Sequence, residues 1–133
     1  MPTMFKSDLP TRKQVKARAD RAEAKVAKAV RAKCVERDED SRVRWSAWAS
    51  MGGTLEQITS RPEWAHLHAQ RRSKTAGMPP EARHSTQWSL MLPRAIHRLY
   101  DAKELDITAL TDRGADGPLR FEYRGKNYEE PER

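Results

Sequence analysis

The sequence has one cysteine and no long apolar run, and each shortage excludes a class of protein. The single Cys34 cannot form a disulfide within the chain, and it cannot build a thiolate metal site. No stretch approaches the roughly 18 consecutive apolar residues that a membrane-spanning helix needs. The N-terminus lacks a basic region followed by an apolar core, so we expect no secretory signal. These absences favour a cytoplasmic protein that does not contact membranes.

Positive charge is what the sequence has in excess. The net charge is +7 and the isoelectric point is near 9.9. Between Thr11 and Arg37 there are ten Lys or Arg against three Asp or Glu, whereas acidic residues are prominent after Asp101. Concentrated positive charge predicts a polyanionic partner, most often nucleic acid. A basic surface with no such partner is the alternative that net charge leaves open.

The length of 133 residues predicts one small domain with an extension. Only 37% of the residues are hydrophobic, so we expect a modest core. We divide the chain into a basic helical extension over 1–40, a core over 41–110, and a C-terminal strand and tail over 111–133. The expected fold class is α+β.

A long helix is predicted from Thr11 to about Asp38, because this stretch has no Gly or Pro and is rich in Ala, Lys, Arg and Glu. Small apolar side chains recur along it every three or four positions, at Val15, Ala19, Ala22, Val26, Val30 and Cys34. This narrow stripe buries little area. Three interpretations stay open. The last turns pack on the domain, the basic face lies on DNA phosphates, or the helix pairs with a second copy in a homodimer.

The four histidines all fall between His66 and His97. Glu63 to His68 predicts a short strand on which His66 and His68 share a face. A basic loop with Arg71, Arg72 and Lys74 follows, and a loop of this length in a small domain is commonly functional.

A second short strand is predicted at Leu90–Leu92, followed by a helix from Pro93 to about Ala102. This helix would place His97 and Asp101 one turn apart on one face. Two ligands for one divalent ion and a simple surface contact are both open interpretations of that pair.

Two further segments complete the pattern. Trp45 and Trp48 are typical of core or lid packing, with stacking on a nucleic-acid base as the alternative. Near the C-terminus, Leu119, Phe121 and Tyr123 alternate with charged residues, which predicts a half-buried strand. Gly125-Lys-Asn127 would turn this strand back into a β-hairpin.

Three segments together resemble the HNH endonucleases, especially the small ones encoded by phages and prophages. They are Glu36-Arg-Asp-Glu-Asp-Ser-Arg-Val-Arg44, Glu63-Trp-Ala-His-Leu67 and Trp88-Ser-Leu-Met-Leu-Pro-Arg-Ala-Ile-His-Arg-Leu-Tyr-Asp101. Their order and spacing follow the family pattern of two strands and a metal-binding helix. The resemblance implies an HNH-like ββα-metal core in a metal-dependent DNA endonuclease.

The resemblance also implies roles for individual residues. His66 corresponds to the general base that takes a proton from the attacking water. His97 and Asp101 correspond to ligands of one divalent ion, with His68 as a further ligand, and Mg²⁺, Mn²⁺, Ni²⁺ and Zn²⁺ are not distinguished. Gln87 would orient the base.

In the same reading, Arg71, Arg72 and Lys74 would hold the DNA backbone. If the protein is encoded by a phage, as the resemblance implies, it would act in the host cytoplasm, with a phage packaging machine as its partner.

The sequence departs from the family at its zinc-binding cysteines, so we expect no structural zinc. The four cysteine positions are occupied by Ser41, Arg44, Pro93 and Ile96. We expect apolar packing to replace the metal, from Trp45, Trp48, Ile96 and Leu99.

Two catalytic positions also differ, since Ala65 and Trp88 stand where the family carries a ligand and an orienting asparagine. The alternatives are therefore a catalytically inactive HNH-like module that binds DNA or protein, and a helical interaction protein. In an HNH-like site, His66 and His97 should face each other across the ββα unit.

Overall fold

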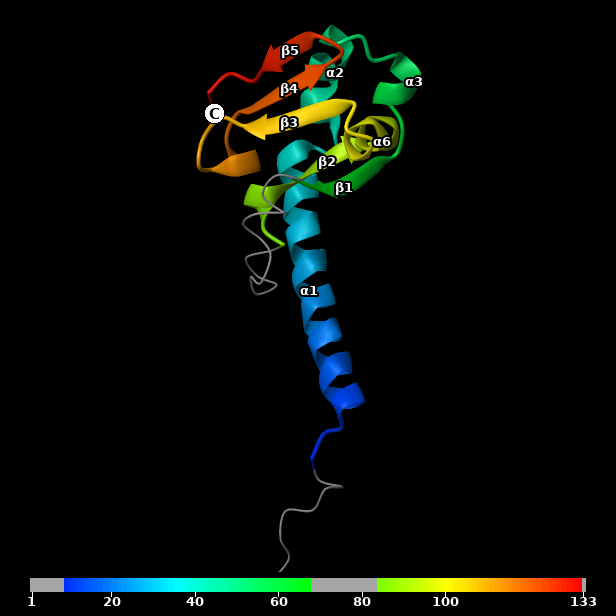
Figure 1. Ribbon diagram of the computed structural model, residues 1–133, viewed down its shortest axis with the longest axis vertical. Helices are drawn as coiled ribbons and strands as arrows, with labels where there is room; N and C mark the ends of the chain where they lie inside the picture. The colour runs from blue at the N-terminus through cyan, green and yellow to red at the C-terminus, as the bar shows by residue number, and fades with distance from the viewer. Residues whose placement is uncertain (1–8, 68–83, 133) are drawn as a thin grey trace, which may run out of the picture.

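The computed structural model describes residues 9–67 and 84–132 (Figure 1). A long N-terminal helix is followed by small antiparallel sheets and short helices, which confirms the predicted α+β class. No helix within these residues is long and apolar enough to cross a membrane. The elements are, in order, α1 (Arg12–Asp38), η2 (Arg42–Arg44), α2 (Trp45–Ser50), α3 (Leu55–Ile58), β1 (Pro62–His66), η3 (Thr86–Trp88), β2 (Ser89–Pro93), α6 (Arg94–Asp101), β3 (Leu105–Ala109), η4 (Gly114–Asp116), β4 (Leu119–Tyr123) and β5 (Lys126–Glu129).

Helix α1 begins and ends where its sequence predicts. Thr11 caps its start, since its Oγ1 accepts a hydrogen bond from the Gln14 N–H while the Gln14 side chain accepts one from the Thr11 N–H. The helix ends at Glu39, which adopts the left-handed conformation with φ 51°. Figure 1 shows α1 projecting as a rod from the remaining described residues, 39–67 and 84–132, which we call the head.

The last turns of α1 pack on the head, as one of the three interpretations predicted. Cys34 and Asp38 are fully buried, and Val26 and Val30 are half-buried. Burial in apolar surroundings raises the pKa of the Cys34 thiol, although a hydrogen bond to Ser89 opposes the effect. The first turns, by contrast, are almost entirely exposed.

A buried ionic junction fastens the end of α1 to the head. The Asp38 carboxylate accepts hydrogen bonds from Arg37 at 2.9 Å, from Arg44 at 2.9 Å and from the Met91 N–H at 2.9 Å. Burial alone would raise the pKa of Asp38, but these hydrogen bonds and the two guanidinium charges together lower it. The junction therefore links α1 to η2 and to β2 through one ionised side chain.

The core of the head combines the middle of the chain with its C-terminus. Trp48 and Ile96 are buried in it, and Trp45 and Leu99 pack against it, as we expected for these four residues. The Trp48 ring also lies 4.6 Å from the ring of Phe121, on β4. Side chains from both sides of residue 110 therefore share one core.

Two antiparallel sheets organise the head. Strands β1 and β2 form a pair, and β3, β4 and β5 form a second sheet in that order. The predicted strands and the C-terminal hairpin are present, but β3 and the short helix α2 were not predicted. Pro93 caps α6, whereas we expected it at the first helical position.

Candidate functional site

A chain of hydrogen bonds joins three polar side chains between α1 and β1. His66 Nε2 lies 3.1 Å from His84 Nδ1, and His84 Nε2 lies 3.0 Å from Glu23 Oε1. Glu23 comes from the middle of α1, His66 ends β1, and His84 lies two residues before η3. We call these three residues the histidine relay. It is half-buried, with 16% of the His84 side chain exposed.

The Glu23 carboxylate, at one end of the relay, fixes the tautomer of the neutral His84 ring next to it. An ionised carboxylate only accepts hydrogen bonds, so His84 carries its proton on Nε2, facing Glu23. His84 Nδ1 is then a lone pair, and His66 Nε2 must be the donor between the two rings. The Glu23 carboxylate therefore polarises the His84 ring, which in turn accepts the hydrogen bond from His66.

Trp64 packs against both rings and limits their rotation. Its ring centroid lies 4.5 Å from that of His66 and 5.7 Å from that of His84. Because Trp64 and His66 are two residues apart on β1, they project from the same face of the strand.

The register of the strand pair shows which face this is. Trp64 lies opposite Met91, and His66 lies opposite Ser89. The Ser89 Oγ lies 3.4 Å from the Sγ of Cys34 on α1. Helix α1 therefore covers this face of the strand pair. The histidine relay thus lies on the α1 side.

The other face of the strand pair is turned toward the core and α6. Ala65 and its partner Leu90 are buried in the core, together with Leu92. Glu63 shares this face, and its Oε1 lies 3.1 Å from His97 Nδ1 on α6. Ala65, where the resemblance implies a ligand, is therefore a core side chain.

His66 and His97 consequently project from opposite sides of the β1–β2 pair. This differs from the expectation that they face each other across the ββα unit. The physical reason is the alternation of side chains along β1, which directs position 66 to α1 and position 63 to α6. The structure does bring His97 and Asp101 together, with Nε2 and Oδ2 3.4 Å apart.

The surroundings of His97 do not fit a single ion bound by all its acidic neighbours. Glu63 lies at Nδ1 and Asp101 lies at Nε2, which are different nitrogens on the ring. One ion takes one lone pair of an imidazole, so it cannot bind His97 between both carboxylates. Across residues 9–67 and 84–132, no group of three or more His, Cys, Asp or Glu is arranged to hold a metal.

Gln87 does not orient His66. Its side-chain amide donates a hydrogen bond to the Asp112 carbonyl, which ties η3 to the segment before η4. His66 instead contacts His84, for which the sequence left a ligand role open, and His84 contacts Glu23, which the sequence did not single out. The signal for Glu23 was its place on the seam of α1, three residues before Val26.

Four predicted residues lie outside the described residues. They are the candidate metal ligand His68 and the three cations expected to bind DNA, Arg71, Arg72 and Lys74.

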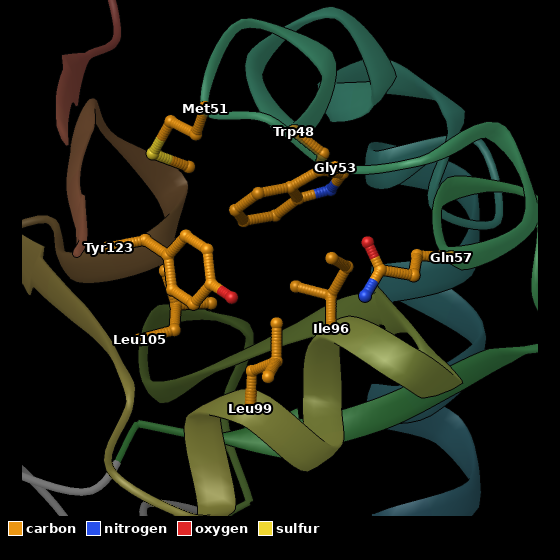
Figure 2. A pocket seen from close by; sticks show the side chains of 8 residues that line it. All are labelled: Trp48, Met51, Gly53, Gln57, Ile96, Leu99, Leu105 and Tyr123. Atoms are coloured by element: carbon orange, nitrogen blue, oxygen red, sulfur yellow. The ribbon is translucent and has the colours of Figure 1, made fainter.

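A small apolar cavity in the head offers no second site. It has a volume of about 20 Å³, which is room for about one water molecule. Figure 2 shows that Trp48, Ile96, Leu99 and Tyr123 are among the side chains around it. Tyr123 is the only ionisable side chain in its lining.

A row of exposed cations lies on α1. Four exposed cations follow one another at helical spacings, namely Arg18, Arg21, Lys25 and Lys28. We call them the α1 cation stripe.

Comparison of the sequence with protein-family models and curated proteins, and with solved structures, gave no match.

Proposed function

We propose that this protein binds DNA, and that the α1 cation stripe holds the phosphate backbone. The observation that carries the proposal is the position of the stripe on the helix. At 3.6 residues per turn, Arg18, Arg21, Lys25 and Lys28 fall on one face. All four are exposed.

This face lies opposite the one that α1 uses for packing. The packing face contains Val26, Val30, Cys34 and Asp38, which are half-buried or buried. With about 100° between successive residues, the two sets are centred roughly half a turn apart. The helix therefore packs on the head with one side while its cations face outward.

The expected binding is electrostatic and independent of sequence. The stripe runs over ten helical steps, or about 15 Å along the axis. Each phosphate that it neutralises would add about 0.9 to the slope of log affinity against log salt concentration. Affinity should therefore fall steeply as salt increases.

The test compares two variants with the same net charge. In the first, the four stripe cations are replaced by Gln, which is a good helix former. In the second, four exposed cations of the head are replaced by Gln, namely Arg94, Arg98, Lys103 and Lys126. Binding of a fluorescent DNA duplex is measured by anisotropy across a salt series.

We expect the stripe variant to lower the salt slope by about 3, and the head variant to leave it within about 1 of the wild type. Equal losses in both variants would mean that only net charge matters, and the proposed surface would be wrong.

A second candidate is the metal-dependent endonuclease of the HNH type. It is favoured by the consecutive order of β1, β2 and α6, with His66 at the end of β1 and His97 on α6. The histidine relay also supplies an orienting partner for His66. Against it stands the separation of His66 from His97 on opposite faces of the strand pair.

Plasmid nicking with Mg²⁺, Mn²⁺ or Ni²⁺ at low salt tests this candidate. A nuclease with one centre loses activity in both His66→Ala and His97→Ala. Activity lost in His66→Ala alone would place the centre at the relay. Nicking that is equal in all three proteins would indicate a contaminating nuclease and would reject the candidate.

A further inference from the structure

We propose that His66 and His84 form a two-histidine site for a borderline divalent cation such as Zn²⁺ or Ni²⁺, with Glu23 as the outer carboxylate. The inference is independent of DNA binding by α1. It assigns His66 as a ligand, a different role from the general base that the HNH resemblance implies.

The first argument is the separation of the two nitrogens. His66 Nε2 and His84 Nδ1 are 3.1 Å apart. Two imidazole nitrogens at about 2.0–2.1 Å from a tetrahedral ion are separated by roughly 3.3 Å. The distance therefore needs to grow by only a few tenths of an ångström, and each ring turns by roughly 35° so that its lone pair points at the ion instead of at the other nitrogen.

The second argument is the protonation state that Glu23 imposes. Its carboxylate faces His84 Nε2 at 3.0 Å, so the neutral ring presents a lone pair at Nδ1. A ligating histidine whose other nitrogen donates to a carboxylate is the usual outer-shell arrangement of protein zinc sites. His84 and Glu23 already have this arrangement.

The remaining ligand forms by a change of tautomer. In the relay, His66 Nε2 carries the proton that lies between the rings. When an ion binds, this proton moves to Nδ1 of the same neutral ring, and Nε2 becomes the second ligand. Between neutral rings, this step moves the proton within the His66 ring and releases none.

The donor set determines the class of ion. Two imidazoles suit Zn²⁺, Ni²⁺ or Cu²⁺, while Mg²⁺ and Ca²⁺ prefer oxygen ligands. Since the described residues give two protein ligands, the other positions of the ion are left for water or for an oxygen of a bound anion. The ion would also bridge β1 and the segment before η3, next to the middle of α1.

The test is isothermal titration of the untagged full chain with ZnCl₂ and with NiCl₂ at pH 7.5. Four variants are compared with the wild type, namely His66→Ala, His84→Ala, Glu23→Gln and His97→Ala. His97 is the matched control, because it is a half-buried histidine beside two carboxylates on the other face of the strand pair. Circular dichroism verifies that each variant is folded, and His84→Asn replaces any alanine variant that is not.

We expect one ion per chain, and a loss of affinity of at least tenfold in His66→Ala and in His84→Ala. Glu23→Gln should weaken binding about 10- to 100-fold, as the loss of other outer-shell partners does. His97→Ala should bind as the wild type does, and MgCl₂ should give no heat.

Imidazole NMR spectra provide a second readout in the folded wild type. Zn²⁺ should shift the ring signals of His66 and His84 and leave those of His97 in place. Absence of Zn²⁺ and Ni²⁺ binding, or unchanged affinity in His66→Ala and His84→Ala, would overturn the proposal. In that case the relay is a hydrogen-bonded chain without a metal.

Discussion

Helix α1 and the head differ in charge and in burial. The helix carries ten Lys or Arg and four Asp or Glu over residues 12–38, and Cys34 and Asp38 are its buried residues. The head carries ten Lys or Arg against thirteen Asp or Glu in its described residues, and it contains the apolar core. A basic rod is thus joined to a compact body whose described residues carry no excess of positive charge.

Because of this difference between α1 and the head, DNA binding and folding stability should depend on different residues. The surface proposed to bind DNA is on exposed turns of α1, where no core packing constrains the side chains. The contacts that fix the helix in place are concentrated in its last turns, around Asp38. Substitutions should therefore fall into two groups, those that change stability and those that change binding.

The largest expected effect comes from breaking the junction at Asp38. Asp38→Ala removes the carboxylate that Arg37 and Arg44 share, and Arg44, which is 1% exposed, keeps only its contact with Glu130 at 3.2 Å. Removing one partner of a buried ion pair costs about 3–5 kcal/mol. Urea denaturation followed by circular dichroism should show this loss of the free energy of unfolding.

The control for this variant is Asp40→Ala, two residues away. Asp40 lies 3.8 Å from Arg42, and both side chains are more than half exposed. An exposed pair of this kind contributes less than about 1 kcal/mol. Residue 40 also has a left-handed φ of 66°, so alanine there adds a backbone cost of about 1 kcal/mol at most, and the total stays below that of Asp38→Ala. Similar losses in Asp38→Ala and Asp40→Ala would show that the junction does not fasten α1 to the head.

The same carboxylate predicts a dependence on pH. The pKa of Asp38 is lowered in the folded state, so the folded protein binds fewer protons than the unfolded chain does. The stabilisation is complete above the pKa of an unfolded Asp, about 3.9, and is lost as pH falls through the lower folded pKa. Plots of unfolding free energy against pH should be flatter below pH 5 in Asp38→Asn than in the wild type. Equal slopes would contradict an ionised Asp38 in the folded protein.

Sequence patterns predicted the helices and strands that have strong local signals. Thr11, the absence of Gly and Pro, and the alternation at Leu119, Phe121 and Tyr123 gave α1 and β4. Strand β3 was missed because its burial depends on pairing with β4, in which Ile107 lies opposite Phe121. A pattern in a few neighbouring residues cannot predict this long-range contact.

Of the histidine relay, only His66 had a definite role predicted from the sequence, and the surroundings of that side chain were not predicted. The spacing of His66 and His97 resembles that of the general base and a metal ligand in HNH endonucleases, but spacing does not specify the face of a strand. The face of His66 follows from the packing of α1 on Ser89 and Met91, a long-range contact. The role of Glu23 likewise could not be predicted from local sequence, since Glu23 is 61 residues away in the chain from the His84 that it contacts.

A smaller effect is expected within the head, at Gly114. This residue has φ +60°, and an added Cβ would collide with the backbone carbonyl of Gln87. Gly114→Ala should cost about 2–4 kcal/mol, from the left-handed conformation together with the collision. Thermal unfolding measures the loss.

Gly125 is the matched control, because it has φ +79° and an added Cβ would meet no atom within 4 Å. Gly125→Ala should therefore show the backbone cost alone, about 1 kcal/mol. If the two variants unfold alike, the contact between Gly114 and Gln87 does not hold η3 against η4.

The smallest expected change in the free energy of unfolding comes from Ala→Gly substitutions that compare the two halves of α1. Ala19 and Ala29 are both exposed on the helix, but residue 29 lies within the turns that pack on the head. Replacing Ala by Gly in a helix costs about 1 kcal/mol. At Ala29 this cost should appear in global unfolding, because those turns are folded whenever the head is. At Ala19 the outer turns should fray locally, so the global free energy changes by less than about 0.3 kcal/mol. Hydrogen exchange should then be faster before residue 23 only. An equal loss of global stability in both variants would mean that α1 unfolds with the head as one unit, and the separation of binding from stability would not hold.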